Sequence, residues 1–175
     1  MCALAFSGIP AKAQENPPVQ VASCKVAQLS ATEDQAEADS VEGGLGHGAK
    51  TFAIRNRSVS LCVLEGVPTL TLADKANRAL PASVCSNCPD YLFASQPVRR
   101  IVLKPNQSAY LVIAYNINDG VGECREAATL GFHLRDQREP LNVNVVQGRD
   151  EMRSCGGLDI TPFLAKPPVD GFLPR

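Results

Sequence analysis

Apolar and polar positions alternate with a period of two in several short runs of this chain. Around residues 51–55, Phe52 and Ile54 fall on one face, whereas Lys50 is assigned elsewhere. Residues 67–72 repeat the pattern, with two leucines facing one way between two threonines. This period is typical of a β-strand that buries one face. Both runs are therefore predicted strands.

Further β-branched or apolar runs follow, separated by turn residues. The sequence Lys104-Pro105-Asn106-Gln107 suits a β-turn, because Pro and Asn favour its two central positions. The last run ends at Pro162 and is predicted to be an edge strand. The additional predicted strands are residues 26–30, 98–103, 109–115, 130–134, 141–146 and 158–162.

About eight or nine short strands, with no long amphipathic helix between them, indicate an all-β sandwich or barrel. We expect an all-β sandwich domain stabilised by disulfides. Residues 31–42 are rich in Ala and Glu, but they carry no apolar stripe that would hold a helix to a core. This segment is interpreted as a solvated loop with at most one helical turn.

The N-terminal residues resemble a shortened signal peptide. An apolar run over residues 1–6 is followed by Ala11-Lys12-Ala13, which matches an A-x-A cleavage site. The positively charged region is missing, so we expect the true start to lie upstream, where a lipobox would add a lipid anchor. The alternative is a disordered cytosolic tail. The expected organisation is a signal peptide at 1–13, a linker at 14–23, the sandwich domain at 24–165 and an extended tail at 166–175.

Composition narrows the function classes. The 175 residues are 45% hydrophobic and 20% charged, with a net charge of −1. Such a balance gives no attraction to polyanions, and the chain has no Trp and few clustered basic residues, so nucleic-acid binding is not expected. No apolar run reaches the roughly 20 residues of a membrane-spanning helix. No transmembrane span is expected.

Six cysteines follow the linker and are spread along the chain. An even number without clustering is typical of an oxidised, exported framework. Six cysteines allow 15 pairings, so the count alone fixes no connectivity. They are Cys24, Cys62, Cys85, Cys88, Cys124 and Cys155.

The Cys85-x-x-Cys88 motif has three interpretations. A loop disulfide is favoured, because prolines flank the motif and no helix or βαβ unit follows to acidify a thiol. A thiol–disulfide redox site is the first alternative. The second is a metal site that adds His47 and His133, although their spacing does not match a zinc motif. His47 is otherwise a turn residue between glycines, and His133 a strand residue.

Two other motifs are interpreted as structural. Gly44-x-Gly46-x-x-Ala49 resembles a dinucleotide-binding pattern, but it precedes a strand and not a helix, which makes its glycines turn residues. An acidic stretch lacks the alternation and the glycine of a calcium loop and is assigned to a solvated loop. Its residues are Glu33, Asp34, Glu37, Asp39 and Glu42. No catalytic motif is found, so an enzyme is not expected.

Several short motifs together resemble a bacterial family of secreted proteins and lipoproteins whose domain has no assigned function. The most specific is Cys62-Val63-Leu64-Glu65-Gly66-Val67-Pro68, and the resemblance covers residues 24–163. The supporting motifs are Cys24, Gly46-His47-Gly48, Asn56-Arg57-Ser58, Leu103-Lys104-Pro105, Cys124, Cys155 and Leu158-Asp159-Ile160-Thr161-Pro162-Phe163. The resemblance implies an immunoglobulin-like antiparallel β-sandwich, an envelope location and four family cysteines, which match Cys24, Cys62, Cys124 and Cys155. Cys85 and Cys88 depart from the family pattern, as does Asn106, where the family often has Gly.

We expect disulfides Cys24–Cys62, Cys124–Cys155 and Cys85–Cys88. The two long loops would each stabilise the fold by about 4 kcal/mol, and the short one by roughly 2 kcal/mol. The run from Cys62 to Pro68 is expected to be architectural, with Leu64 buried beside Cys62 and Gly66 at a positive φ or a close backbone approach.

These features predict an exported, non-enzymatic structural or interaction domain of the cell envelope, either secreted or periplasmic. Its partner would be an unknown protein or envelope component, and no cofactor or metal is expected. The alternatives are a redox protein that uses Cys85 and Cys88, and an envelope metal-binding module.

Overall fold

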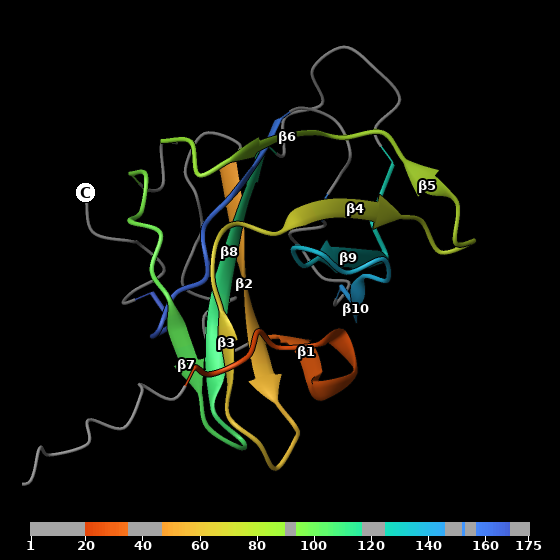
Figure 1. The fold of residues 1–175 in the computed structure, drawn as a ribbon. Helices are drawn as coiled ribbons and strands as arrows, with labels where there is room; N and C mark the ends of the chain where they lie inside the picture. The colour runs from red at the N-terminus through yellow and green to blue at the C-terminus, as the bar shows by residue number, and fades with distance from the viewer. Residues whose placement is uncertain are drawn as a thin grey trace, which may run out of the picture.

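The computed structural model describes residues 20–34, 47–89, 94–116, 125–145, 152 and 157–168. Within these ranges the chain forms eleven strands and one short 3-10 helix, arranged in two larger sheets and one small one (Figure 1). The predicted all-β, sandwich-like, disulfide-bonded fold is confirmed, with more strands than the eight or nine expected. The expected signal peptide at 1–13 lies outside the described residues.

The larger sheet has five strands, in the order β1-β2-β8-β11-β6. All neighbours are antiparallel except β11 and β6, which run parallel. The parallel pair departs from the purely antiparallel sheet that was predicted. The strands are β1 (Leu29–Glu33), β2 (His47–Asn56), β6 (Ser83–Ser86), β8 (Ser108–Asn116) and β11 (Gly157–Ile160).

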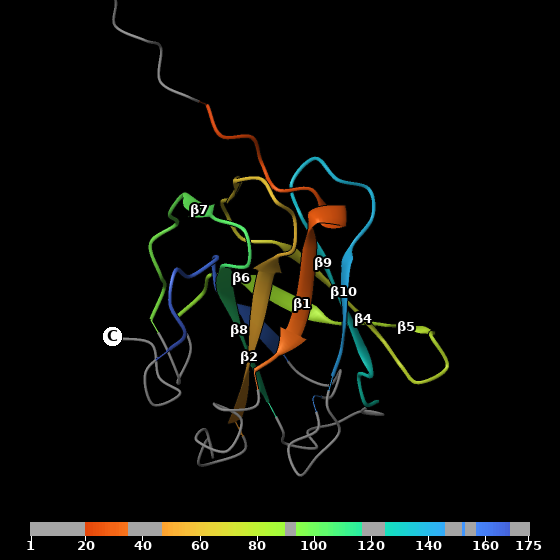
Figure 2. The same cartoon turned by 90° about the horizontal axis from the view of Figure 1, so that it is seen from below.

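The second sheet has four antiparallel strands in the order β10-β9-β4-β5, and a third sheet consists of the pair β3 and β7. In Figure 1 the strands β4 and β9 run across the direction of β2 and β8. Figure 2 shows β1 between β2 and β10, at the side where the two large sheets meet. The strands are β3 (Cys62–Leu64), β4 (Thr69–Ala73), β5 (Ala79–Leu80), β7 (Ile101–Leu103), β9 (Thr129–His133) and β10 (Leu141–Asn144).

The core lies between the two large sheets. Phe52 of β2 and Phe132 of β9 meet edge to face, with ring centroids 5.5 Å apart, and both are fully buried. Such an aromatic pair contributes about 0.5–1.5 kcal/mol beyond the area that it buries. Strand β8 is buried on both faces, since Leu111 faces this core and Val112 packs on the outer side with Leu164. The segment after β11 therefore covers the back of the five-stranded sheet.

Several sequence predictions are confirmed. Leu70 and Leu72 of β4 are buried, as are Phe52 and Ile54 of β2. The predicted turn joins β7 to β8: the Gln107 N–H donates to the Lys104 carbonyl at 3.0 Å, and Asn106 has a φ of 65°. Asn tolerates this left-handed conformation better than most residues, which explains its place in the turn. Strands β9 and β10 pair antiparallel across the predicted loop.

The predicted strand at residues 26–30 is partly wrong. Val26–Gln28 form a 3-10 helix, labelled η1, and β1 begins only at Leu29. The Lys25 N–H donates to the Gln28 side-chain oxygen and the Gln28 N–H to the Lys25 carbonyl, both at 2.8 Å. These local hydrogen bonds close a turn that apolar residues alone did not reveal.

Three further predictions need correction. Val98 lies outside β7 and is exposed, so the strand is shorter than residues 98–103. Strand β11 is not an edge strand, because β6 pairs with its free side. His47 is not a turn residue but begins β2.

The sequence pattern places Lys50 away from the face of Phe52 and Ile54, and Glu33 in a solvated loop; both predictions are wrong. Lys50 shares the inner face of β2 with Phe52, as strict alternation requires. Its Nζ lies 2.7 Å from the Glu33 carboxylate, and the side chains are only 8% and 2% exposed. Glu33 belongs to β1 together with Ala31, so residues 31–33 are strand and not loop. The other acidic positions, Glu37, Asp39 and Glu42, lie outside the described residues.

Candidate functional site

The structure places four of the six cysteines. Cys24 and Cys62 form a disulfide with Cα atoms 4.7 Å apart, and they are 2% and 1% exposed. The bond ties the N-terminal segment to β3, where the Cys24 N–H also donates to the Val63 carbonyl at 2.9 Å. Cys124 and Cys155 lie outside the described residues, so their pairing remains a prediction.

Cys85 and Cys88 also form a disulfide, at the end of β6. Cys85 lies opposite Asp159 of β11 in the parallel register, and one carboxylate oxygen of Asp159 lies within 4.8 Å of both sulfurs. A metal ion could use these three groups only after reduction, because thiolates and not disulfide sulfurs are its ligands. His133, whose side chain the structure describes, is not part of this group.

His133 and Cys85 belong to different sheets. His133 ends β9 in the four-stranded sheet, whereas Cys85 belongs to the five-stranded one. The His133 Nε2 lies 3.2 Å from the Thr71 hydroxyl, a contact across two neighbouring strands. Of His47 only the backbone position at the start of β2 is described. His133 therefore does not join Cys85 and Cys88 in the metal site that was considered from the sequence.

Asn87, between the two cysteines, fixes the neighbouring segment. Its N–H donates to the Ile160 carbonyl at 2.7 Å, and its φ is 60°. The Asn87 side chain donates to the Gln96 carbonyl at 2.9 Å and accepts from the Gln96 N–H at 2.7 Å. The disulfide turn thus acts as a clamp on residues 94–97. No local sequence pattern predicts this contact.

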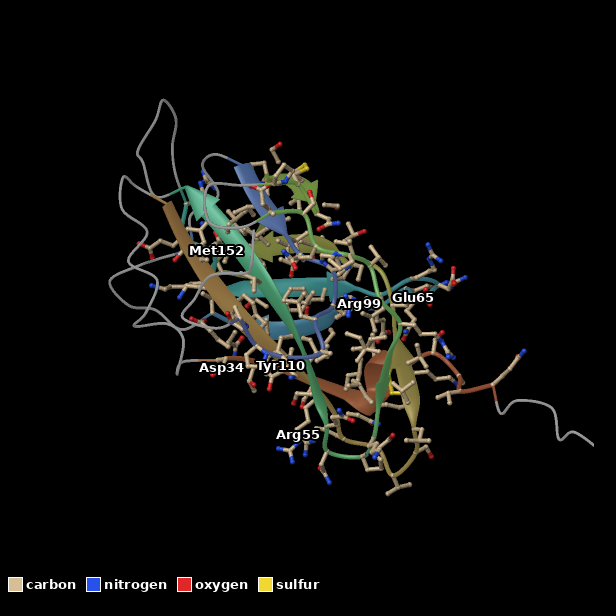
Figure 3. All side chains as sticks on the ribbon, turned by 90° about the vertical axis from the view of Figure 1, so that its left-hand side faces the viewer. Asp34, Arg55, Glu65, Arg99, Tyr110 and Met152 are labelled. Carbon is tan, nitrogen blue, oxygen red and sulfur yellow. A yellow bond between two sulfur atoms is a disulfide. The ribbon has the colours of Figure 1, made fainter. Side chains whose placement is uncertain are left out.

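Gln96 and Pro97 of this segment line an apolar groove, defined by residues 96–97, 99, 101 and 163–168. Its volume is about 400 Å³, within the usual range for ligand sites. The lining is mostly apolar and includes Pro97, Ile101, Leu164 and Pro167. Figure 3 labels Arg99, which lines the groove beside the segment that leads into β7.

Comparison with protein-family models gives one match, to a domain of unknown function, DUF4232, over residues 24–163. The chain belongs to the DUF4232 family. No curated protein and no solved structure matched the chain. The family resemblance seen in the sequence is thereby supported at the level of an uncharacterised domain family.

In this DUF4232 domain the Cys62–Pro68 run borders a second hollow, the Gly66 cavity. Its volume is about 460 Å³, and residues 23–25, 63–68, 134–137 and 163 line it. Gly66 has a φ of 94°, as predicted, which only glycine adopts without strain. Leu64 is 3% exposed, and the Gly66 carbonyl accepts from the Phe163 N–H at 3.2 Å. These contacts give the run an architectural role.

Gln137 of the β9–β10 loop also lines the Gly66 cavity. Its side-chain oxygen accepts from the Val26 N–H at 2.7 Å, and its amide nitrogen donates to the Cys24 carbonyl at 2.7 Å. The β9–β10 loop is thereby joined to the N-terminal segment beside the buried disulfide. Phe163 lines both this cavity and the apolar groove, so the two hollows are neighbours.

A carboxylate in the turn between β4 and β5 of the DUF4232 domain has a perturbed pKa. The Asp74 carboxylate accepts from the backbone N–H groups of Arg78 and Ala76, both at 2.9 Å, and from the Arg78 Nε at 2.8 Å. The backbone N–H and then the guanidinium of Arg78 hold the pKa of Asp74 below its usual value, against a smaller opposing effect of burial. This carboxylate stabilises the β4–β5 turn.

No helix among the described residues is long and apolar enough to cross a bilayer.

Proposed function

We propose that this DUF4232 domain is an exported, non-enzymatic binding domain of the bacterial cell envelope. The observation that carries the proposal is the buried Cys24–Cys62 disulfide. Disulfides of this kind persist in oxidising compartments and are rare in the cytosol. The bond joins the first described segment to the core, so oxidation stabilises the folded domain.

The proposed binding role is supported by the way the polar residues are used. The buried polar side chains in the described part of the chain are all hydrogen-bonded. Asn56, Thr161 and the Glu33–Lys50 pair join strands to one another. A rigid scaffold of this type can present loops and grooves to a partner without a reactive centre.

Thiol trapping in the natural host tests the proposal. The gene would be expressed with its native upstream region, and cells would be fractionated after rapid alkylation of free thiols. We expect the protein in the envelope or the medium, with the tryptic peptides that contain Cys24 and Cys62 linked before reduction. A version that begins at Gln14, behind a new start codon, provides the cytosolic control, and its thiols should be alkylated. Cytosolic protein with both residues alkylated in the native version would overturn the proposal.

A further inference from the structure

We propose that the apolar groove binds a fatty acid of about twelve carbons, with the acyl chain along its walls and the carboxylate near Arg99 and Lys166. This inference rests on the proposed binding role and names its ligand class. The groove is about 400 Å³ in volume and runs between two chain segments that are more than 60 residues apart in sequence. Only the folded domain creates it.

The lining favours an acyl chain over a peptide. Apolar groups dominate the walls, with Ile101 and Phe163 at the inner side and Pro97 and Pro167 more exposed. Prolines offer no N–H donor, so a peptide backbone laid against such walls would find few hydrogen-bond partners in them. An alkyl chain has no such groups and gains free energy from every methylene that leaves water.

Two positively charged side chains in the groove favour a ligand with a negative charge. Arg99 and Lys166 both line the groove and are exposed. Among the described residues, no acidic side chain lines the groove and neither cation forms a salt bridge. The whole chain carries a net charge of −1, so this positive pair is a local feature. An anionic headgroup complements it.

Both walls are held in place before any ligand arrives. On one side, Asn87 fixes Gln96 by two hydrogen bonds. On the other side, Leu164 exchanges two backbone hydrogen bonds with Tyr110 of β8, each at 2.8 Å. A preformed groove loses little conformational entropy on binding, which favours affinity for a simple chain.

Calorimetry with dodecanoate, below its micellar concentration, tests the inference. Dodecanol and dodecyltrimethylammonium carry the same chain with a neutral or cationic headgroup, and acetate carries the headgroup without the chain. We expect one dodecanoate per domain, with binding about tenfold weaker for dodecanol, weaker still for the cation and absent for acetate. Equal affinity for the three twelve-carbon probes, or no binding of dodecanoate, would overturn the inference.

Matched variants locate the site. The double variant Arg99→Glu/Lys166→Glu should weaken dodecanoate binding about tenfold or more, whereas Lys104→Glu/Arg138→Glu makes the same charge change elsewhere and should leave it unchanged. Ala165→Phe should fill the groove and abolish binding, with Ala76→Phe, at the exposed β4–β5 turn, as its control. Melting curves confirm that each variant is folded. Unchanged binding in the groove variants would overturn the assignment, whereas the export proposal is judged separately by thiol trapping.

Discussion

The side-chain amide of Asn56 donates a buried hydrogen bond of 3.1 Å to the backbone carbonyl of Leu103, and so ties the end of β2 to β7. The same amide donates to the Ser60 carbonyl at 2.8 Å. Its oxygen accepts from the N–H and the hydroxyl of Ser58. All four hydrogen-bonding positions of the amide are therefore used, which accounts for the Asn56-Arg57-Ser58 motif.

Replacement of Asn56 should destabilise the fold sharply. Asn56→Ala removes a side-chain donor from the buried Leu103 carbonyl, and we expect a loss of about 1–3 kcal/mol in the free energy of unfolding. Asn56→Asp should be worse at neutral pH, since it turns a carboxylate toward two carbonyl oxygens. Denaturant unfolding measures both, with the exposed Asn144→Ala as control. Wild-type stability of Asn56→Asp would contradict the structural role.

Leu64 should be a core residue in energetic terms. It is 3% exposed in β3, next to the Cys24–Cys62 disulfide. Leu64→Ala is expected to lower the free energy of unfolding by about 2–5 kcal/mol. Val102→Ala on the paired strand β7, where the side chain is 41% exposed, should have a much smaller effect. A Leu64→Ala protein that melts like the wild type would disprove the architectural interpretation of this run.

The Cys85–Cys88 disulfide should stabilise mainly the segment next to it and contribute little to global stability. Its four-residue loop stabilises the fold by only roughly 2 kcal/mol. Cys85→Ser/Cys88→Ser should therefore remain folded, but the Gln96 amide should exchange its hydrogen faster because the Asn87 clamp loosens. Hydrogen exchange followed by mass spectrometry measures this. In Cys24→Ser/Cys62→Ser the loss should instead be global, about 4 kcal/mol. Unchanged exchange at residues 94–97 in the first variant would refute the clamp.

Asp74 should make stability depend on pH in the acidic range. Its pKa in the folded state lies below the usual value of about 3.9, mainly because the Arg78 backbone N–H and guanidinium favour the ionised form. Ionised Asp74 therefore stabilises the fold above about pH 4, and this contribution is lost as the pH falls through the lowered pKa. Asp74→Asn should be less stable than the wild type at pH 7.

The difference between wild type and Asp74→Asn should shrink as the pH drops below about 4, where the wild-type carboxyl becomes protonated. Urea unfolding at a series of pH values gives the comparison. Glu139→Gln changes an exposed carboxylate on the β9–β10 loop and serves as control. A stability difference that stays constant down to pH 2 would show that the ionisation of Asp74 is not responsible.

Alternation of apolar residues predicted the strands that bury one strong face, such as β2 with Phe52 and β4 with Leu70. It could not predict β6, whose side chains are largely exposed and whose partner β11 follows about 70 residues later. Non-local pairing of this kind has no local sequence signal. For the same reason the apolar groove was missed, because Arg99 and Lys166 share it only after folding.

The buried Glu33–Lys50 pair also affects the register in which β1 pairs with β2. Strand β1 has a weak apolar face, with Leu29 buried and Ala31 only partly so. In a strand, a shift of one residue turns every side chain to the opposite face. Such a shift would move Glu33 away from Lys50 and leave an ammonium group buried without its counter-charge, a penalty of about 3–5 kcal/mol. The ion pair thus discriminates against misregistered pairing of β1 with β2, whatever it contributes to the stability of the correct one.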